Sequence, residues 1–314
     1  MPDRLGPPLE TPLVPRLALV GLGLIVSSIA RATKARGLAG TIVAIDRDPA
    51  VLARVQELGI ADEVTTDLAA GAGDADIVIL CIPVGAFGSV AQAIAPSLKS
   101  GAILSDTGSV KKTMIDQAAP HLPDGVHLVP AHPVAGTEHS GPDAGFATLF
   151  RERWCILTPP EGTDPDAVGR VTAFWTAMGA NVEVMTAEHH DLVLAITSHV
   201  PHLIAYNIVG TAADLEEVTQ GEVIKFSAGG FRDFTRIAAS DPTMWRDIFL
   251  HNKGAVLEML GRLNEDIAIL ARAIRWGDGD ALFDLFTRTR AIRRGIISEG
   301  QETPEPDFGR RREE

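Results

Sequence analysis

The stretch RLALVGLGLIV, residues 16–26, decides the fold. Its first five residues form a short apolar run typical of a buried strand, and Gly21 and Gly23 follow directly. The residues after them, SSIARATKA at 27–35, have helical character. A glycine turn between a strand and a helix is the context of a dinucleotide-binding fingerprint. In such a fingerprint Gly21 makes the tight turn, and Gly23 lets the backbone approach the pyrophosphate at the helix N-terminus.

The third position of this fingerprint is Val26, where glycine or alanine is usual. We therefore expect the branched side chain to push the helix outward and to weaken cofactor affinity. The carboxylate of Asp46, 25 residues after Gly21, ends the next predicted strand and can accept hydrogen bonds from ribose hydroxyls. It favours NAD by repelling the 2′-phosphate of NADP, although Arg47 partly compensates. The predicted cofactor-binding residues are Gly21, Gly23, Leu24, Ile25, Asp46, Arg47 and Pro83.

Both features have simpler interpretations. Two glycines alone can form an ordinary turn between a strand and a helix, and Asp46 can be a turn or helix-cap residue. The position of each relative to a predicted strand favours the cofactor site.

Short β-branched runs alternate with helical stretches as far as about Met185, which predicts a mainly parallel, doubly wound sheet. After Thr186 the strand signals stop. The fold class is therefore α/β, with an N-terminal Rossmann-type doubly wound sheet followed by an all-helical C-terminal domain. The predicted strands are RLALV at 16–20, TIVAID at 41–46, DIVILCI at 76–82, AILSD at 102–106, VHLVPA at 126–131, WCILT at 154–158 and NVEVM at 181–185.

The domain organisation follows from the same pattern. We expect a flexible, proline-rich leader at 1–15 and a dinucleotide-binding domain at 16–186. A helical domain for substrate binding and dimerisation is expected at 187–300, and a flexible tail at 301–314.

The helical domain contains a long amphipathic pattern. Ser240, Asp241 and Pro242 supply a cap and a first-turn proline, so one helix of roughly 50 Å is expected from Pro242 onward. Such a stripe needs a partner surface, which favours a homodimer, with burial against its own subunit as the alternative. The apolar residues that share this face are Val256, Leu260, Leu263, Ile267, Leu270 and Ile274.

Composition restricts the function classes. A formal net charge of −13 over 314 residues disfavours a nucleic-acid binder, which needs a basic face. Only Cys81 and Cys155 are present and no signal-peptide pattern occurs, so inert thiols and a cytoplasmic location are expected. No apolar run reaches membrane-spanning length; the nearest, at 76–84, is about half of that and contains a proline, so no membrane partner is expected.

Ligands of open α/β sheets bind beyond the carboxyl ends of the strands, where His132 follows a predicted strand. Imidazole exchanges a proton near neutral pH, so His132 is the leading catalytic candidate, although a structural role is equally compatible with its position. The histidines at 189, 190, 199 and 202 could instead bind zinc. No HExxH or cysteine-pair spacing accompanies them, and no metal is expected.

Four ordered segments carry a resemblance to a known family. They are DTGSVK at 106–111, HPVAGTEHSGPDAG at 132–145, SHVPH at 198–202 and GGFRDFTRIAASDPTMWRDI at 229–248. Together they resemble the segments shared by prephenate and arogenate dehydrogenases. The resemblance covers essentially 16–290, and Val26 is its clearest departure.

The resemblance implies NAD-dependent oxidative decarboxylation of prephenate and/or arogenate to 4-hydroxyphenylpyruvate and/or tyrosine, a step of tyrosine biosynthesis. His132 would take the proton of the ring hydroxyl, and Ser109 would hold the hydroxyl and the imidazole. Arg236 would bind a substrate carboxylate, although an ion pair with a neighbour such as Asp233 or Asp241 is its simpler interpretation. The implied substrate-binding residues are Arg236, His202, Ser198 and Thr137.

Two other functions fit a Rossmann-type domain followed by helices. A β-hydroxyacid dehydrogenase would need a catalytic lysine in the first long helix after the sheet, and residues 188–206 contain none. A non-catalytic dinucleotide sensor would not need His132, Ser109 and Arg236 together. The choice between prephenate and arogenate, the degree of NADP use and feedback inhibition by tyrosine stay open at this point.

Overall fold

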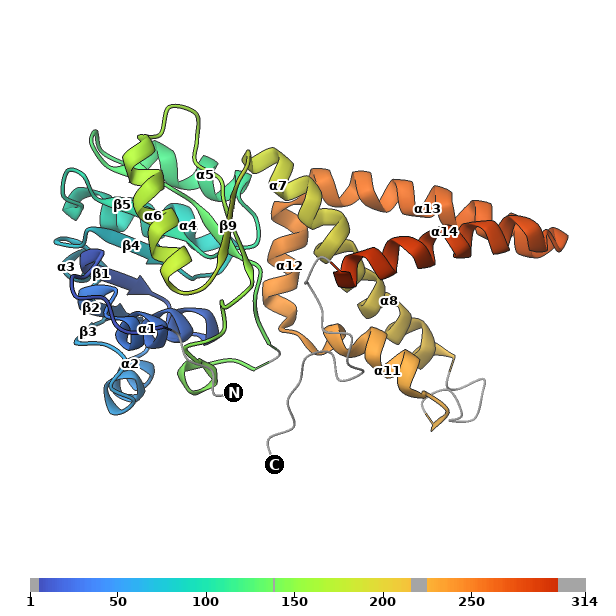
Figure 1. Ribbon diagram of the computed structural model, residues 1–314, viewed down its shortest axis with the longest axis horizontal. Coiled ribbons are helices and arrows are strands. Elements are labelled where there is room, and N and C mark those ends of the chain that lie inside the picture. Colours follow the sequence, from blue (N-terminus) through green and yellow to red (C-terminus); the bar gives the residue numbers. More distant parts are fainter. Residues whose placement is uncertain (1–5, 138, 216–224, 299–314) are drawn as a thin grey trace. The chain divides into compact units, whose positions relative to one another are not determined.

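The computed structural model describes residues 6–137, 139–215 and 225–298. By its internal contacts the chain divides into two compact units, residues 1–256 and 257–314, and each is described by itself (Figure 1). Helix α7 begins at Ala187, next to the expected boundary at residue 186, whereas the contacts divide the chain after Val256. The expected domain boundaries therefore stay predictions.

A six-stranded parallel sheet forms the centre of the first unit, in the order β3-β2-β1-β4-β5-β6. From the centre of the sheet, β1, β2 and β3 follow one another toward one edge, and β4, β5 and β6 follow one another toward the other edge. The prediction of a doubly wound sheet is therefore confirmed. Ligands of such sheets bind where the order reverses, here between β1 and β4. The strands are β1 Val14–Val20, β2 Ala39–Ile45, β3 Glu63–Thr65, β4 Ile77–Leu80, β5 Ile103–Asp106 and β6 His127–Leu128.

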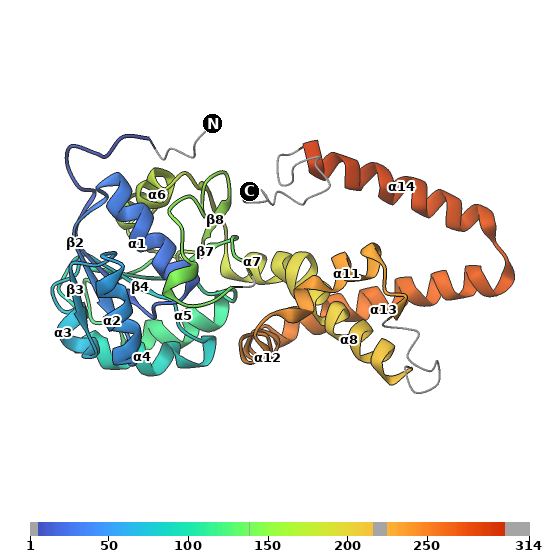
Figure 2. The same ribbon diagram turned by 90° about the horizontal axis from the view of Figure 1, so that it is seen from below.

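Helices cover both faces of this sheet (Figures 1 and 2). Leu17 and Leu19 of β1 pack with the core that contains α1, while Ala18 and Val20 pack with the core that contains α4. Burial on both faces explains why RLALV is a continuous apolar run. The covering helices are α1 Leu24–Arg36, α2 Pro49–Glu57, α3 Leu68–Ala72, η1 Val84–Ala86, α4 Phe87–Ile94, η2 Ala95–Ser97, α5 Lys112–Ala118, η3 Ala119–His121 and α6 Pro165–Ala177.

A second, three-stranded sheet was not predicted. It contains β7 Ala131–Pro133, antiparallel to β8 Trp154–Leu157, which is parallel to β9 Asn181–Val184. The single strand expected at 126–131 is therefore wrong, because β6 ends at Leu128 and β7 belongs to the other sheet. Pro130 lies between them and has no N–H to continue the ladder. His132 thus lies within a strand and not beyond one. The short β3 was also missed by the sequence pattern.

A buried ion pair joins the two sheets. Lys111 Nζ donates to Asp106 Oδ2 at the end of β5, at 2.5 Å, and to the carbonyl oxygen of Ala131 in β7, at 2.7 Å. Asp106 Oδ1 accepts the amide of Ala131 at 3.2 Å. Both charged side chains are fully buried. Burial raises the pKa of Asp106 and lowers that of Lys111, and the attraction between the two charges opposes both shifts.

The remaining described elements are helical, so the expectation of no strand after residue 186 holds for the described residues. Helix α12 packs against η1, and α7 packs against α5. The elements are η4 Pro142–Ala144, α7 Ala187–Leu194, the π-helical turn η5 Ala195–His199, α8 Val200–Asp214, α11 Gly229–Thr235, η6 Arg236–Ala239, α12 Pro242–His251, α13 Lys253–Trp276 and α14 Gly279–Ser298.

The single long helix expected from Pro242 is wrong, because Asn252 separates α12 from α13. Its backbone has φ −104° and ψ 30°, outside helical geometry. The buried amide of Asn252 donates to the carbonyl oxygen of Asp191 at 2.8 Å and to His199 Nδ1 at 3.1 Å. These two bonds hold the residue out of the helical path. The start of α12 is as expected, with Asp241 accepting the amide of Met244 at 2.8 Å.

The expectation that no apolar run is long enough to cross a membrane needs correction. The helical run Ala187–Asp214 has 28 residues and a mean hydropathy of 1.5, which suffices by length and composition alone. Its polar residues His190 and Asp191 are buried and hydrogen-bonded to the sheet-containing part of the first unit. We therefore assign the run to the folded domain.

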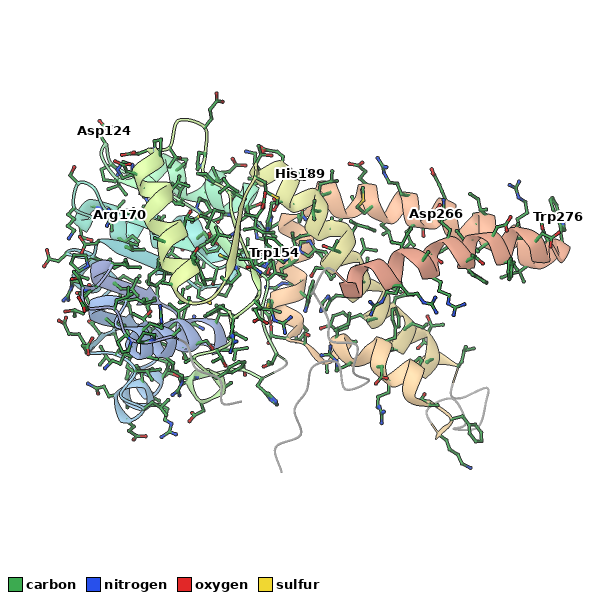
Figure 3. All side chains as sticks on the ribbon, viewed as in Figure 1. Asp124, Trp154, Arg170, His189, Asp266 and Trp276 are labelled. Atoms are coloured by element: carbon green, nitrogen blue, oxygen red, sulfur yellow. The ribbon has the colours of Figure 1, made fainter. Side chains whose placement is uncertain are left out.

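In the second unit, α13 and α14 diverge from a turn at Gly277, whose φ is 68° (Figure 2). Ile274 is 67% exposed, and Trp276, labelled in Figure 3 at the end of α13, is 74% exposed. Large apolar side chains therefore lie open along both helices of the isolated chain. The others are Leu257, Ile267, Ile269, Phe283, Phe286 and Ile292.

Replacing Lys111 with methionine should leave the Asp106 carboxylate buried without its cation. Breaking one partner of a buried pair typically costs about 3–5 kcal/mol, so we expect Lys111→Met to lower the free energy of unfolding by this amount. Urea unfolding followed by tryptophan fluorescence measures the change.

Lys112→Met is the matched control, since Lys112 is half-exposed and pairs with Asp116 at the surface. It should change the free energy of unfolding by no more than about 0.5 kcal/mol. A Lys111→Met protein as stable as this control would contradict the structural role of the buried pair.

Candidate active site

The glycine turn after β1 has the geometry of a phosphate-binding turn. Gly21 has φ 86°, and a Cβ there would lie 2.2 Å from the carbonyl oxygen of Cys81, so no other residue fits. Gly23 is the N-cap of α1, and nothing lies within 4 Å of where its Cβ would be. Leu24 and Ile25 then form the first turn of α1. Open space in front of a helix N-terminus suits an anionic pyrophosphate.

Val26, the unusual residue of the fingerprint, is fully buried in the core that contains Leu17 and Leu19. Its amide donates to the thiol of Cys81. Burial raises the pKa of the Cys81 thiol, and that of Cys155 still further. Both cysteines are free, as expected. The effect of Val26 on cofactor affinity stays a prediction.

Asp46 follows β2 directly and faces the glycine turn. Its Oδ2 accepts the amide of Leu22 at 2.9 Å, and its Oδ1 accepts the amide of Asp48 at 3.0 Å. Asp46 is therefore a turn residue, and its carboxylate also borders the predicted cofactor site. Arg47 and Pro83 are exposed, and Pro83 caps η1 after β4. All three lie at the carboxyl end of the parallel sheet, where the prediction put them.

His132 is 8% exposed and lies in β7 next to the buried ion pair. Its Nδ1 is hydrogen-bonded to Nε2 of His190 at 2.8 Å, and Nδ1 of His190 is hydrogen-bonded to Oδ1 of Asp191 at 2.8 Å. Burial lowers the pKa of His132 well below its ordinary value, and the neighbouring His190 and Lys111 lower it further. The imidazole is therefore neutral at pH 7 and able to accept a proton.

Sequence patterns missed the role of His190, the hydrogen-bond partner of His132, and of Asp191, the partner of His190. His190 is completely buried, and burial is the main reason why its pKa is lowered, although Asp191 opposes the shift. Asp191 accepts the backbone amides of Lys111, at 2.8 Å, and Lys112, at 3.0 Å, at the start of α5. The only available signal was the polar triplet HHD at 189–191 in an otherwise apolar stretch.

An open hollow of about 350 Å³ lies on the face of the small sheet that carries His132. His132 stands directly opposite Ile156 across the β7–β8 pair, and Ile156 stands opposite Glu183 in β9. Residues opposite one another share a face of the sheet. Trp154, labelled in Figure 3 at the start of β8, is on the same face. The lining residues are Trp154, Ile156, Glu183 and Met185.

The other predicted residues of the first half, Ser109 and Thr137, lie in the segments that follow β5 and β7. Ser109 is half-buried in the turn after β5, which Asp106 shapes by accepting the amide of Gly108 at 2.7 Å. Among the described residues Ser109 makes no hydrogen bond to His132, so its role stays a proposal. Thr137 is exposed in the loop after β7, where its hydroxyl accepts the amide of His139 at 3.3 Å.

The predicted residues of the second half gather around Trp245 of α12. His202 stacks on the Trp245 ring at 3.7 Å between centroids, and its Nδ1 donates to the carbonyl oxygen of Ser198 at 2.9 Å. Burial lowers the pKa of His202, and the positive charge of Arg236 lowers it further, which places Arg236 within electrostatic range. Arg236 is exposed at the start of η6.

The simpler role expected for Arg236 is an ion pair with Asp233 or Asp241. Asp233 lies 3.8 Å from the guanidinium of Arg232, and Asp241 caps α12. These contacts do not test the role of Arg236, which stays a proposal.

His199 connects the two halves. It lies close enough to lower the pKa of His132, and His202 lies close enough to lower the pKa of His199, so the three imidazoles are near one another. Burial lowers the pKa of His199 to about 4. His199 Nε2 and Trp245 Nε1 are buried polar atoms without a partner among the described residues. Such atoms are rare in protein cores.

The site residues Ser198 and His199 belong to the π-helical turn η5, which precedes Pro201 in α8. π-helical turns within α-helices frequently occur at functional sites. In the described part of the chain, no group of three or more His, Cys, Asp or Glu side chains is placed to hold a metal ion. Of the histidines considered for zinc, His190 and His199 have hydrogen-bond partners, and His202 stacks on Trp245.

Two family models match the chain. The nucleotide-binding domain of prephenate dehydrogenase matches residues 29–184, and the dimerization domain of prephenate dehydrogenase matches residues 186–288. The chain is 44% identical to the cyclohexadienyl dehydrogenase of Zymomonas mobilis over 88% of this chain and 94% of that protein. It is 34% identical to the prephenate dehydrogenase of Bacillus subtilis over 89% of this chain and 76% of that protein.

Solved structures give the same result. Prephenate dehydrogenase from A. aeolicus in complex with hydroxyphenyl propionate and NAD+ matches with a TM-score of 0.84 and 33% identity, over 90% of this chain and 98% of that chain. Synechocystis arogenate dehydrogenase matches with a TM-score of 0.77 and 26% identity, over 90% and 99% of the two chains. With both halves matched and relatives above 30% identity across most of its length, this chain belongs to the prephenate dehydrogenase family.

Proposed function

We propose that this protein catalyses the NAD-dependent oxidative decarboxylation of prephenate and/or arogenate to 4-hydroxyphenylpyruvate and/or tyrosine, in tyrosine biosynthesis. The observation that carries the proposal is a neutral, buried imidazole, His132, close to the carboxyl edge of a doubly wound sheet with a glycine turn. That combination suits oxidation of an alcohol, which must lose a proton from oxygen and a hydride from carbon.

His132 is the proton acceptor of the proposed reaction. It accepts the proton of the C4 hydroxyl as the C4–O bond becomes a carbonyl and hydride leaves C4. The bond between the ring and its carboxylate then breaks, CO2 departs, and its electron pair makes the ring aromatic. The former carbonyl oxygen regains a proton as the phenol hydroxyl, for which protonated His132 is the nearest donor. The gain in aromaticity drives the reaction, so the residues mainly have to position the substrate.

The substrate-binding roles follow the places of the side chains. Arg236 pairs with a substrate carboxylate through its guanidinium group. It lies within electrostatic range of His202, because its positive charge lowers the pKa of that imidazole. Ser198 and Thr137 contribute polar groups beside the ring. Ser109, in the turn shaped by Asp106, holds the reacting hydroxyl. The lack of a charged lysine in residues 188–206 disfavours the β-hydroxyacid dehydrogenase alternative.

NAD, when bound, supplies the hydride acceptor. Gly21 and Gly23 would hold its pyrophosphate together with the amides of Leu24 and Ile25 at the start of α1. Asp46 would accept the ribose hydroxyls, with Arg47 beside it, and Pro83 would border the cofactor after β4. A sensor that binds NAD without catalysis would lack NADH formation with either substrate, and steady-state assays separate the two functions.

A homodimer in the cytoplasm is the proposed state. The exposed apolar side chains of α13 and α14, within or next to the matched dimerization domain, support a second copy of this chain as the partner. Two free cysteines agree with a reducing compartment.

The cofactor assignment predicts a higher kcat/KM with NAD than with NADP. Asp46→Ser should narrow this ratio by about tenfold, corresponding to about 1.4 kcal/mol, because it removes the charge that repels the 2′-phosphate. Asp48→Ser is the matched control, since Asp48 is an exposed carboxylate that caps α2, and it should leave the ratio unchanged. Equal use of both cofactors by the unmodified protein would contradict the assignment.

The two substrate-site roles predict different kinetic losses. His132→Asn should lower kcat by roughly 100- to 10,000-fold with little change in KM, as expected for loss of a general base. Arg236→Gln should act mainly on KM, with a loss of about thirty- to several-hundred-fold in kcat/KM, the equivalent of roughly 2–4 kcal/mol. Neither change should abolish NAD binding, measured by calorimetry. Near-normal kcat in His132→Asn would refute the role of His132.

The exposed faces of α13 and α14 predict a dimer by analytical ultracentrifugation at micromolar concentration. Phe283→Asp should raise the dimer dissociation constant at least about tenfold, because Phe283 is 69% exposed in the single chain and the change would place a charge in the proposed dimer contact. Asp266→Asn, on the exposed surface of α13 (Figure 3), is the control and should have no effect. A stable, active monomer would show that dimerisation is not required.

A further inference from the structure

A continuous line of hydrogen bonds connects the proposed base to a carboxylate. His132, His190 and Asp191 are joined by two bonds of 2.8 Å. The two imidazole rings meet edge to face, with centroids 5.0 Å apart and planes at 68°. His190 is completely buried, and Asp191 is 5% exposed. Three polar side chains in line, away from water, need complementary donors and acceptors.

The carboxylate fixes the direction of every proton in the line. Both oxygens of Asp191 accept backbone amides, at Lys111 and Lys112, so this group acts as an acceptor. His190 Nδ1 must then donate to Asp191. A neutral His190 has its lone pair on Nε2, which can only accept from Nδ1–H of His132. The remaining nitrogen of His132, Nε2, therefore carries the lone pair.

We infer that His190 and Asp191 are positioning residues, which hold His132 in the Nδ1–H tautomer so that its Nε2 accepts the substrate proton. The inference rests on the proposed function of His132 as the base. Without this line, a neutral imidazole would divide between two tautomers and could rotate. Only one arrangement presents a lone pair to the reacting hydroxyl.

Asp191 is held in place by contacts with three elements of the fold. Its carboxylate binds the start of α5, its backbone carbonyl accepts the amide of Asn252 after α12, and its own helix is α7. A role limited to capping α5 would also explain the bonds to Lys111 and Lys112. That role would not require His190 between the carboxylate and His132. Substitutions at His190 therefore distinguish a positioning role of Asp191 from a role limited to capping α5.

Two substitutions at His190 separate positioning from packing. His190→Leu fills space but removes the acceptor for His132, and we expect kcat to fall about 10- to 100-fold with KM changed less than about twofold. His190→Gln offers a carbonyl oxygen to His132 and an amide to Asp191. The kcat of His190→Gln should be at least about tenfold higher than that of His190→Leu. His189→Leu is the matched control on the exposed neighbour in α7 (Figure 3) and should behave as wild type.

Nitrogen-15 NMR of the histidine-labelled full chain reads the tautomer directly, with His132→Asn assigning the signals. In the wild type and in His190→Gln, His132 should show a protonated Nδ1 and an unprotonated Nε2. In His190→Leu this signature should be lost. A wild-type His132 with protonated Nε2 overturns the inference, even if His190→Leu fails to fold. So does a folded His190→Leu with unchanged kcat.

The spectrum of the wild type needs no substrate, so it tests the positioning line separately from the proposed reaction. Absence of NADH formation by the wild type would reject the proposed function, while the tautomer signature would still report whether His190 and Asp191 orient His132.

Discussion

The carboxylate of Asp106 and the ammonium of Lys111 form the contact on which the rest of the site depends. Burying two charges is costly, and the cost is offset here because every partner is in place: the cation meets the carboxylate and a carbonyl, and the carboxylate meets two amides. These bonds hold the end of β5, the turn with Ser109 and the start of β7 in one arrangement. The position of His132 follows from that arrangement.

The same cation influences the chemistry of the base. A positive charge and a dry environment both favour neutral His132, which keeps the imidazole ready to accept a proton but reduces its basicity. His132 is also hydrogen-bonded to His190, which is in turn hydrogen-bonded to the carboxylate of Asp191. The site therefore combines a cation that favours the neutral form of His132 with a line of hydrogen bonds that ends at a carboxylate.

Local features of the fold could be predicted from sequence, and features that depend on distant contacts could not. The β1–Gly21–α1 unit follows from adjacent residues, and its glycines have the expected geometry. The division of 126–131 between two sheets depends on Asp106 accepting the amide of Ala131, 25 residues away. Likewise, His190 lies 58 residues from His132, and the bonds of Asn252 reach 61 and 53 residues along the chain. No periodicity carries such information.

The π-helical turn η5 gives the run Ala187–Asp214 two different phases. An α-helix advances about 100° per residue, and a π turn accommodates one additional residue, so the helix after the turn is rotated relative to the helix before it. The phase before it directs His190 toward β7, and the phase after it directs His202 toward Trp245. If residues 195–199 were α-helical instead, the same sequence would advance by one more residue around the helix, and His202 would be rotated by about 100° away from its ring partner. The wide turn thus lets one helical run face His132 with His190 and Trp245 with His202.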